Sequence, residues 1–394
     1  MVIRVVACIF MFFSSVGMCS ELPDAVSPSS KKLRFFNLDL HISVIADVKD
    51  IFEALGHEVV DWSISSHTWV FGRNPDPVEV INNATWYPLT KEKREQFYAR
   101  YHDFLSQFDG FIVTHACSFA LLYEKFNKPI IVVSSTRYEN PFTEDEDSWR
   151  LLDNFFRERV KANKAFIVAN NKGDQHYFEY YTGIKPEHIP NLCLYTKCKY
   201  TGNRKGFIVR SFSDHMRIFT TDRLSDKDLI QNSQLPWGYP WSLLYDFQGI
   251  IHFPYNVSLM SIFEQYSANV PLFFPSKEYI RQLHNELPTI VLSDLSYYFL
   301  RHIPIPNVLN DPNNVNDPRV VDRWIDSCDF YDEENMPYVQ YFDSIEHLEQ
   351  LLQTADLREI SKKMGEYNEK RRNRVFKQWR DLLERIIETE SLSQ

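Results

Sequence analysis

The sequence predicts an α/β protein built from two Rossmann-like domains and a long C-terminal helix. Short apolar runs alternate with helix-like stretches, which indicates a parallel sheet joined by crossovers. The alternation pauses near residue 200 and then starts again, which indicates a second sheet. The chain has 394 residues, enough for two domains of common size. From Ser344 to about Glu388 nearly every residue is a helix former, and Ser344 suits an N-cap.

The first domain is expected over residues 33–200, followed by a linker near 196–204. Its apolar runs predict strands at 33–38, 58–62, 110–114, 130–134 and 165–169. Its helix-like stretches are 42–56, 118–126 and 174–181. Because strands and helices alternate throughout, we expect a single parallel sheet with helices packed against it.

The second domain is expected over residues 205–355 and is the smaller of the two. Its apolar runs predict strands at 206–210, 248–253, 270–274 and 338–342. The segment 304–337 is rich in Pro, Asn and Asp and predicts an irregular loop over the surface. Residues 356–394 complete the predicted C-terminal helix.

The N-terminus has the pattern of a secretory signal. Arg4 precedes an apolar run at 5–18, and small residues follow before the charged Glu21. We therefore expect residues 1–20 to be a signal peptide or a short signal anchor, and 21–32 to be a polar linker. The protein is then expected in the ER or Golgi lumen or secreted, and any membrane association would run through this segment.

A lumenal location has two chemical consequences. Two glycosylation sequons occur, Asn83-Ala84-Thr85 in a polar loop and Asn256-Val257-Ser258 in a turn, so we expect a glycoprotein modified at Asn83. Cys193 and Cys198 are close enough in sequence to close a small disulfide loop in an oxidising compartment.

Composition excludes several function classes. The net charge of −10 argues against a nucleic-acid groove, which needs a concentrated basic face. Only 11 glycines occur, and neither G-x-G-x-x-G nor G-x-x-x-x-G-K-[ST] is present, which disfavours dinucleotide and P-loop sites. We therefore expect no nucleic-acid partner and no dinucleotide cofactor.

The segment 249–275, GIIHFPYNVSLMSIFEQYSANVPLFFP, is the most informative in the chain. It predicts a buried strand, a polar turn, a short helix and a second buried strand. Ser258 and Ser261 lie where the helix begins, and free N–H groups there attract phosphate. Glu264 is the i+3 neighbour of Ser261, so one ligand could touch both. Phosphate beside a carboxylate indicates a nucleotide with its ribose, although an ordinary βαβ unit with hydroxyl caps has the same pattern.

This segment resembles the donor-sugar site of GT-B glycosyltransferases of the family 1 and 4 kind. Their second domain has a serine-rich turn, a helix with a ribose-binding Glu, and a strand that begins like Val270-Pro271. The resemblance implies two domains that face a cleft, with the C-terminal helix crossing back onto the first. It also implies a glycosyltransferase that moves a sugar from a nucleotide-sugar co-substrate to a glycan or other hydroxyl acceptor.

Donor and acceptor residues follow from position. Ligands of open parallel sheets bind at the carboxyl ends of the strands. On the second domain the expected donor-binding residues are Arg210, Tyr255, Asn256, Ser258, Ser261 and Glu264. On the first domain the positions after strands are Asp39 and His41, Ser65 to His67, His115, Arg137-Tyr138-Glu139 and Asn170-Asn171. Of these, His67, Arg137, Tyr138 and Glu139 are expected on the acceptor side.

The acceptor hydroxyl must lose a proton as it attacks, which suits a histidine or a carboxylate. His41 is the first choice for the base, because it follows the first strand where inverting members of the fold place theirs. Asp39 would orient His41 or replace it, and His115 is the rival base. For either histidine alone, a hydrogen-bonded structural role is the alternative.

No essential metal is expected. The two D-x-D patterns, Asp145-Glu146-Asp147 and Asp226-Lys227-Asp228, lack a preceding apolar strand and are interpreted as solvated. The E-x7-E pattern of retaining enzymes has Asn256 in place of its first Glu, which disfavours a retaining assignment. The competing functions are a nucleotide-sugar epimerase of the same fold and a secreted, non-catalytic sugar- or nucleotide-binding protein.

Overall fold

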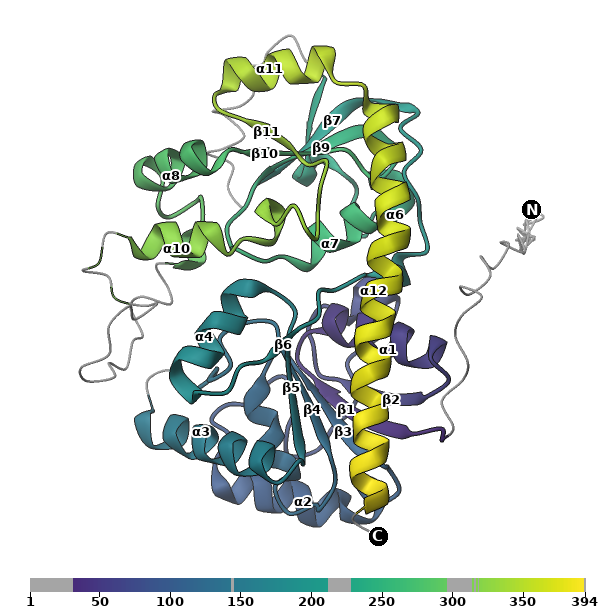
Figure 1. The fold of residues 1–394 in the computed structure, drawn as a ribbon, viewed down its shortest axis with the longest axis vertical. Coiled ribbons are helices and arrows are strands. Elements are labelled where there is room, and N and C mark those ends of the chain that lie inside the picture. The colour runs from purple at the N-terminus through teal and green to yellow at the C-terminus, as the bar shows by residue number, and fades with distance from the viewer. Residues whose placement is uncertain are drawn as a thin grey trace, which may run out of the picture.

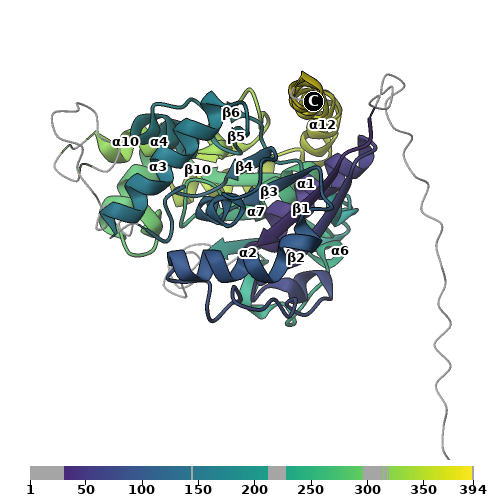
Figure 2. The same cartoon turned by 90° about the horizontal axis from the view of Figure 1, so that it is seen from below.

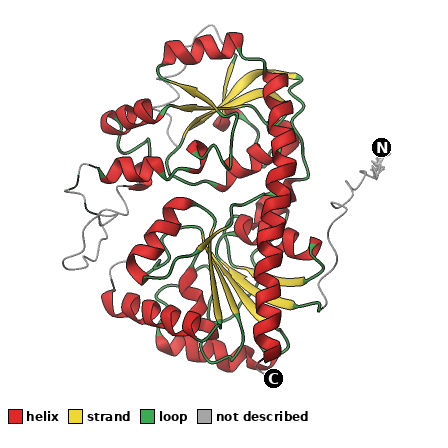
Figure 3. Ribbon diagram, viewed as in Figure 1, coloured by secondary structure: helices red, strands yellow, loops and turns green. Residues whose placement is uncertain are grey.

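The structure is a computed structural model that describes residues 31–142, 145–211, 228–295, 314, 317 and 319–392. Two sheets are present, one above the other in Figure 1, and every strand pair is parallel. Helices cover both sheets, as the colouring of Figure 3 shows. The predicted α/β class and the two Rossmann-like domains are thus confirmed.

The first sheet has six strands in the order β2-β1-β3-β4-β5-β6. Its strands are β1 Arg34–Asp39, β2 Glu58–Ser63, β3 Gly110–Thr114, β4 Ile130–Ser134, β5 Ala165–Ala169 and β6 Glu187–His188. Its helices are α1 Ile42–Ala54, α2 Lys91–Leu105, α3 Glu146–Lys161 and α4 Lys172–Thr182, with 3-10 turns η1 Thr68–Phe71, η2 Cys117–Tyr123 and η3 Leu194–Thr196. Strands β3 and β4 are buried along their whole length, as parallel strands covered on both faces must be.

The second sheet has five strands in the order β11-β10-β9-β7-β8. Its strands are β7 Arg204–Ser211, β8 Leu229–Gln231, β9 Phe247–Phe253, β10 Leu272–Pro275 and β11 Gln340–Phe342. Its helices and turns are η4 Asn232–Gln234, α6 Trp241–Leu244, α7 Met260–Ser267, α8 Lys277–Glu286, α10 Val320–Asp326, η5 Asp329–Tyr331 and α11 Ile345–Thr354.

Helix α12, Leu357–Leu392, crosses from the second domain back onto the first. Its C-terminal half shares a core with α1, where the rings of Trp379 and Phe52 lie 5.2 Å apart, and Figure 2 shows the two helices side by side. Midway, the buried Arg371 donates to Asn335 and Ser267 of the second domain and to the carbonyl of Asn191, which follows β6 of the first domain. The crossing helix is therefore part of both cores.

Three local expectations were wrong. The expected helix at 118–126 is replaced by the 3-10 turn η2 at Cys117–Tyr123, whose seven residues are all buried, so it lacks the polar face of a surface helix. The described part of 304–337 is not a surface loop, because it contains α10 and buries Trp324 and Asp329. Cys193 and Cys198 are free thiols, and Cys193 is buried with its Sγ 3.9 Å from the carbonyl of Met260.

The apolar run at 5–18 and the expected signal segment lie outside the described residues. Within the described ranges, no helix is long and apolar enough to cross a membrane. Of the two sequons, Asn83 is exposed in the loop after β2, whereas Asn256 is half-buried and its amide donates to Asp294 at 3.0 Å.

Candidate functional site

The strand order of each sheet creates one crevice, and the two crevices face each other. In an open parallel sheet, ligands bind at the carboxyl ends of the strands where the strand order reverses. In the first sheet this reversal lies between β1 and β3, and in the second between β7 and β9. A cleft of about 1270 Å³ is lined by residues that follow these strands in both domains.

The wall from the first domain carries two histidines. His41 precedes α1 in an extended conformation, and His115 follows β3 with a φ of +58°, a conformation that non-glycine residues rarely adopt. Their rings lie 5.1 Å apart and both line the cleft. Nδ1 of His41 has no hydrogen-bond partner among the described residues.

Both imidazoles are held neutral. Burial, helped by the nearby His67, lowers the pKa of His41 to about 4. Burial, with the charges of His41 and Arg137, lowers the pKa of His115 to about 3. A neutral imidazole can accept a proton, so this wall offers a base over the whole physiological pH range.

Asp39 does not take the expected orienting role. Its carboxylate accepts a hydrogen bond from Ser63 at 3.1 Å, and within the described ranges no hydrogen bond joins it to His41 or His115. Burial raises the pKa of Asp39 well above its usual range. The Asp39 side chain is fully buried and is not among the residues that line the cleft.

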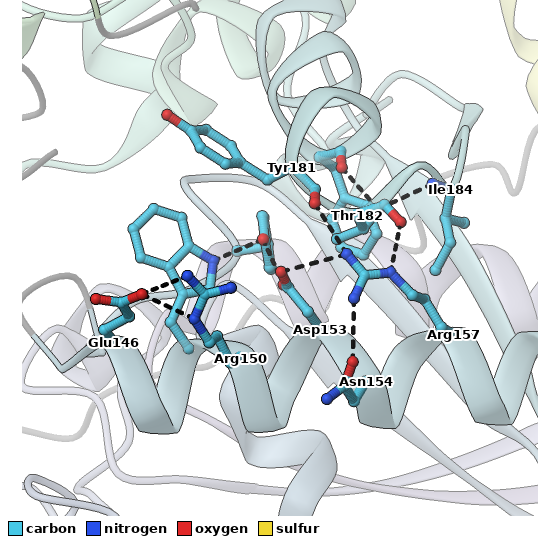
Figure 4. A network of polar contacts seen from close by, with 11 residues as sticks. Glu146, Arg150, Asp153, Asn154, Arg157, Tyr181, Thr182 and Ile184 are labelled. Atoms are coloured by element: carbon cyan, nitrogen blue, oxygen red, sulfur yellow. Dashed lines mark hydrogen bonds and ion pairs between the residues drawn. The ribbon is translucent and has the colours of Figure 1, made fainter. Parts of the chain in front are cut away.

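Only His67 of the four expected acceptor-side residues lines the cleft. Tyr138 points into the core, where it donates to Asp153 at 2.6 Å and accepts from the indole of Trp149. Figure 4 shows the polar network on α3 to which Asp153 belongs. Tyr138 therefore does not line the cleft as expected: its side chain is fully buried in the core, although Ser135 and Thr136, directly after β4, do line the cleft.

Arg137 and Glu139 are also buried beside the cleft instead of lining it. The guanidinium of Arg137 lies 5.2 Å from the ring of Trp324, and its Nε lies 3.7 Å from Asp174. Glu139 accepts from Tyr177 at 3.0 Å, and burial raises the pKa of Glu139 to about 7. Neither side chain therefore lines the cleft, unlike the position expected for an acceptor contact.

The wall from the second domain carries the cleft's charged groups. Arg210, near the end of β7, lines the cleft, and its guanidinium forms no hydrogen bond or ion pair with the part of the chain that the structure describes. Glu264 on α7 lines the same wall and accepts from Tyr195 at 2.6 Å and Trp241 at 3.1 Å. Burial raises the pKa of Glu264, against these two donors and the charge of Arg210.

The polar turn before α7 differs from the expected phosphate cradle. Ser258 lines the cleft, but its hydroxyl donates to the buried carboxylate of Asp329 at 2.6 Å. Helix α7 begins at Met260, and Leu259 occupies the N-cap without a side-chain hydrogen bond. Ser261 lines the cleft, as does Glu264 one turn later, so the expected juxtaposition of these two is present. The hydroxyl proton of Ser258, however, is committed to a carboxylate.

Asn256 and Tyr255 line the cleft after β9, as expected. Several other lining residues were not expected from the sequence, among them Trp69, Trp237, Trp241 and Asp294. For Trp237 and Trp241 the available signal was the segment 235–241, LPWGYPW, which combines aromatic rings with the rigidity of proline. No sequence signal pointed to Asp294, because only the tertiary structure brings it to the cleft, where it accepts a hydrogen bond from Asn256.

The D-x-D patterns do not reach the cleft where they are described. Asp145 caps α3 by accepting from the N–H of Ser148, and Glu146 pairs with Arg150. Asp228 pairs with Lys205, while residues 226 and 227 lie outside the described residues. Among the described residues, no group of three or more His, Cys, Asp and Glu side chains is arranged to hold a metal ion.

Two facing parallel sheets, a cleft between their switch points and a helix that crosses back define the architecture. The fold is GT-B. The expected fold is thereby confirmed from the chain's own topology. No family model matches the chain, and no curated protein does.

Solved structures similar to this GT-B chain are glycosyltransferases. SnogD from Streptomyces nogalater is 13% identical, with a TM-score of 0.42, covering 86% of this chain and 96% of its own. UGT73P12 from Glycyrrhiza uralensis is 11% identical, with a TM-score of 0.45, covering 92% and 97%. The spinosyn rhamnosyltransferase SpnG is 10% identical, with a TM-score of 0.38, covering 85% and 95%. At such identities and scores, these likenesses carry no inference about activity.

Proposed function

We propose that the protein is a glycosyltransferase that moves a sugar from a nucleotide-sugar donor to a hydroxyl acceptor without an essential metal. The observation that carries the proposal is the pairing of two walls across one cleft. Arg210, at the switch point of one sheet, is a cation without a hydrogen bond or ion pair among the described residues, and His41 is a neutral imidazole at the switch point of the other. Group transfer needs both, because one stabilises the leaving anion and the other accepts a proton.

On the donor wall, Arg210 binds the diphosphate by charge-assisted hydrogen bonds. Glu264 is held in place by Tyr195 and Trp241 and uses its remaining lone pairs to accept from the ribose hydroxyls. Ser261 supplies a further hydroxyl. Ser258 takes no direct part in phosphate binding, because its proton goes to Asp329.

On the acceptor wall, His41 removes the proton of the attacking hydroxyl. His115 lies against it and limits its motion, since the two rings are 5.1 Å apart. Asp39 accepts from Ser63 and leaves the base without a carboxylate partner in the described residues. The imidazolium formed in the reaction is then stabilised only by the reacting groups and solvent, which predicts a slow enzyme.

The decisive experiment measures donor use. The purified chain is incubated with a panel of UDP-, GDP- and TDP-sugars, and release of nucleoside diphosphate is followed with and without EDTA. We expect one donor to be hydrolysed slowly in water and faster with an acceptor, and EDTA to have no effect. Tight binding of a nucleoside diphosphate without turnover would identify a binding protein, and the absence of both would overturn the proposal.

A further inference from the structure

Two tryptophans from opposite domains meet at the cleft. Trp69 lies in η1 of the first domain, and Trp237 lies in the loop between η4 and α6 of the second. Their rings are stacked, with centroids 4.9 Å apart and planes inclined by 28°. Both side chains line the cleft.

The two indoles are unusually exposed. Trp69 is 40% exposed and Trp237 is 84% exposed, although burial of an aromatic ring of this size is strongly favourable. Neither indole N–H has a hydrogen-bond partner among the described residues. Trp69 stacks on only part of Trp237, which stays 84% exposed, so most of the Trp237 ring surface is open to solvent. A ligand that covers the exposed indole surface would bury apolar area that is now in contact with water, which favours binding.

The neighbouring wall shows what kind of ligand fits. Its polar lining residues from the first domain are hydroxyl, imidazole and amide groups: His41, Ser43, Ser65, His67, His115, Ser135, Thr136 and Asn170. No Lys, Arg, Asp or Glu is among the described lining residues of this wall, so it offers no ionic partner to a charged acceptor. Its aliphatic lining residues are Ile42, Val44 and Val70. Lipophilic ligands bind in pockets lined mainly by apolar side chains, which this wall does not provide.

A sugar ring matches this combination. Its rim carries hydroxyls that donate to and accept from neutral polar groups, while its C–H face is apolar and packs on an aromatic face. We propose that the acceptor is a neutral oligosaccharide and that one of its sugar rings stacks on the indole of Trp237. This inference rests on the proposed glycosyl transfer and names its acceptor class.

A nucleobase could also stack on an indole, and the geometry favours another place for it. The donor groups Arg210 and Glu264 belong to the second domain, and Trp241 is the tryptophan that contacts Glu264 directly. Trp237 instead meets Trp69 of the acceptor wall. Trp237 is therefore assigned to the acceptor and Trp241 to the donor side.

The test is direct binding, so that it does not depend on turnover. The full chain is titrated with cellotetraose, maltotetraose and chitotetraose, with UDP and GDP, and with the apolar phenol 4-methylumbelliferone, using calorimetry and tryptophan emission. We expect at least one tetrasaccharide to bind and to change the emission. Trp237→Ala should weaken that binding about 10-fold, while Trp237→Phe should restore part of it and UDP or GDP affinity should not change.

Trp86→Phe is the control, because it removes a half-buried indole outside the cleft lining. Its titrations should equal those of the wild type. Thermal unfolding of Trp237→Ala should also match the wild type, since a side chain that is 84% exposed contributes little to the core. If the unfolding midpoint of Trp237→Ala differs from that of the wild type, Trp237→Phe alone serves as the test. Its tetrasaccharide affinity should then be lower than that of the wild type, by less than about 10-fold.

Three outcomes would overturn the inference. They are no binding of any tetrasaccharide, whether or not 4-methylumbelliferone binds; tetrasaccharide binding that Trp237→Ala leaves unchanged; and loss of UDP or GDP affinity in Trp237→Ala. Failure of the proposed function has a different signature. In that case neither UDP nor GDP binds the wild type and no nucleotide sugar is consumed, whatever the tetrasaccharides do.

Discussion

The two walls of the cleft differ in charge. The wall from the second domain carries Arg210, Glu264 and Asp294, whereas the wall from the first domain carries hydroxyls, an amide and imidazoles. The sheets behind them are alike, since both are parallel and both reverse their strand order at the cleft. One architecture therefore supplies two chemically distinct surfaces, and the difference lies in the side chains that line the cleft.

The contrast indicates a division of labour. A charged donor binds best to charged groups held in fixed positions, because hydrogen bonds to charged groups are the stronger ones. A neutral acceptor needs a base that is unprotonated at working pH and a wall that does not attract ions. We therefore expect substitutions in the second-domain wall to change donor binding and leave acceptor binding unchanged. Substitutions in the first-domain wall should leave donor binding unchanged.

The largest expected effect is on the base. His41→Ala should lower kcat by about 100-fold or more while nucleoside diphosphate affinity stays the same, because general-base catalysis acts in the transition state. Steady-state kinetics and calorimetry measure the two quantities. His102→Ala, an exposed histidine on α2, is the control. If His115→Ala alone reproduced the loss, the base would be His115, and equal losses of affinity and kcat would contradict the division between the walls.

The next effect is on the donor charge. Arg210→Met should weaken nucleoside diphosphate binding about 10- to 100-fold, as expected for the loss of hydrogen bonds to a charged group, and should leave oligosaccharide binding unchanged. Lys205→Met removes an exposed cation from the same strand and is the matched control. An unchanged dissociation constant for the diphosphate would remove Arg210 from the donor wall.

A smaller effect is expected at the ribose position. Glu264→Gln should weaken donor binding about 10-fold, because an amide cannot accept from Tyr195, Trp241 and a ribose hydroxyl as a carboxylate does. Tyr195→Phe keeps the carboxylate and removes one of its donors, so it separates ligand contact from positioning. Both affinities are measured by calorimetry. Equal losses of donor affinity in the two variants would show that the hydrogen bond between Glu264 and Tyr195 positions the site and that Glu264 does not touch the donor.

The smallest effect concerns pH. Because the pKa of His41 is lowered to about 4, kcat/KM should stay level from pH 8 to about 5 and fall only below it, instead of falling from pH 6.5 as for an ordinary histidine. A profile with its acid limb near 6.5 would show that His41 is more solvated than its burial implies.

The lowered pKa of His41 also makes the stability of the folded protein depend on pH. Between pH 6.5 and 4 the unfolded state binds a proton at His41 that the folded state does not. The free energy of unfolding therefore decreases as pH falls through this window. Denaturant titrations of wild type and His41→Ala should show a shallower decrease in the variant. Parallel curves would mean that His41 does not titrate differently in the two states.

Much of the fold could be predicted from the sequence. The strands at 110–114, 130–134 and 165–169 have the observed bounds, because fully buried parallel strands are continuous apolar runs. Ser344 caps α11 by accepting from the N–H of His347, as its position before a helical run indicates. The helices α2 and α3 were not predicted, because charged residues dominate them and their buried faces are narrow.

The site was predictable only in part. His41 and His115 follow strands next to the first switch point and Arg210 lies near the end of β7 at the second, and all three line the cleft, as the carboxyl-end rule predicts. Arg137, Tyr138 and Glu139 follow β4 in the same way, yet they turn into the core and form ion-pair and hydrogen-bond contacts with α3 and α4. Position along a strand predicts the edge of the sheet at which a residue lies, but not whether its side chain faces solvent or protein.

The sequence by itself determined the alternation of strands and helices, the restart of the pattern and the polar segment that follows β9. These depend on local periodicity and composition, which are properties of neighbouring residues. Only the tertiary structure decided that Ser258 would donate to Asp329, that Trp69 would stack on Trp237, and that Asp294 would reach the cleft. Each of these contacts joins residues that are far apart in the chain, and only the packing of separate elements sets which side chains meet.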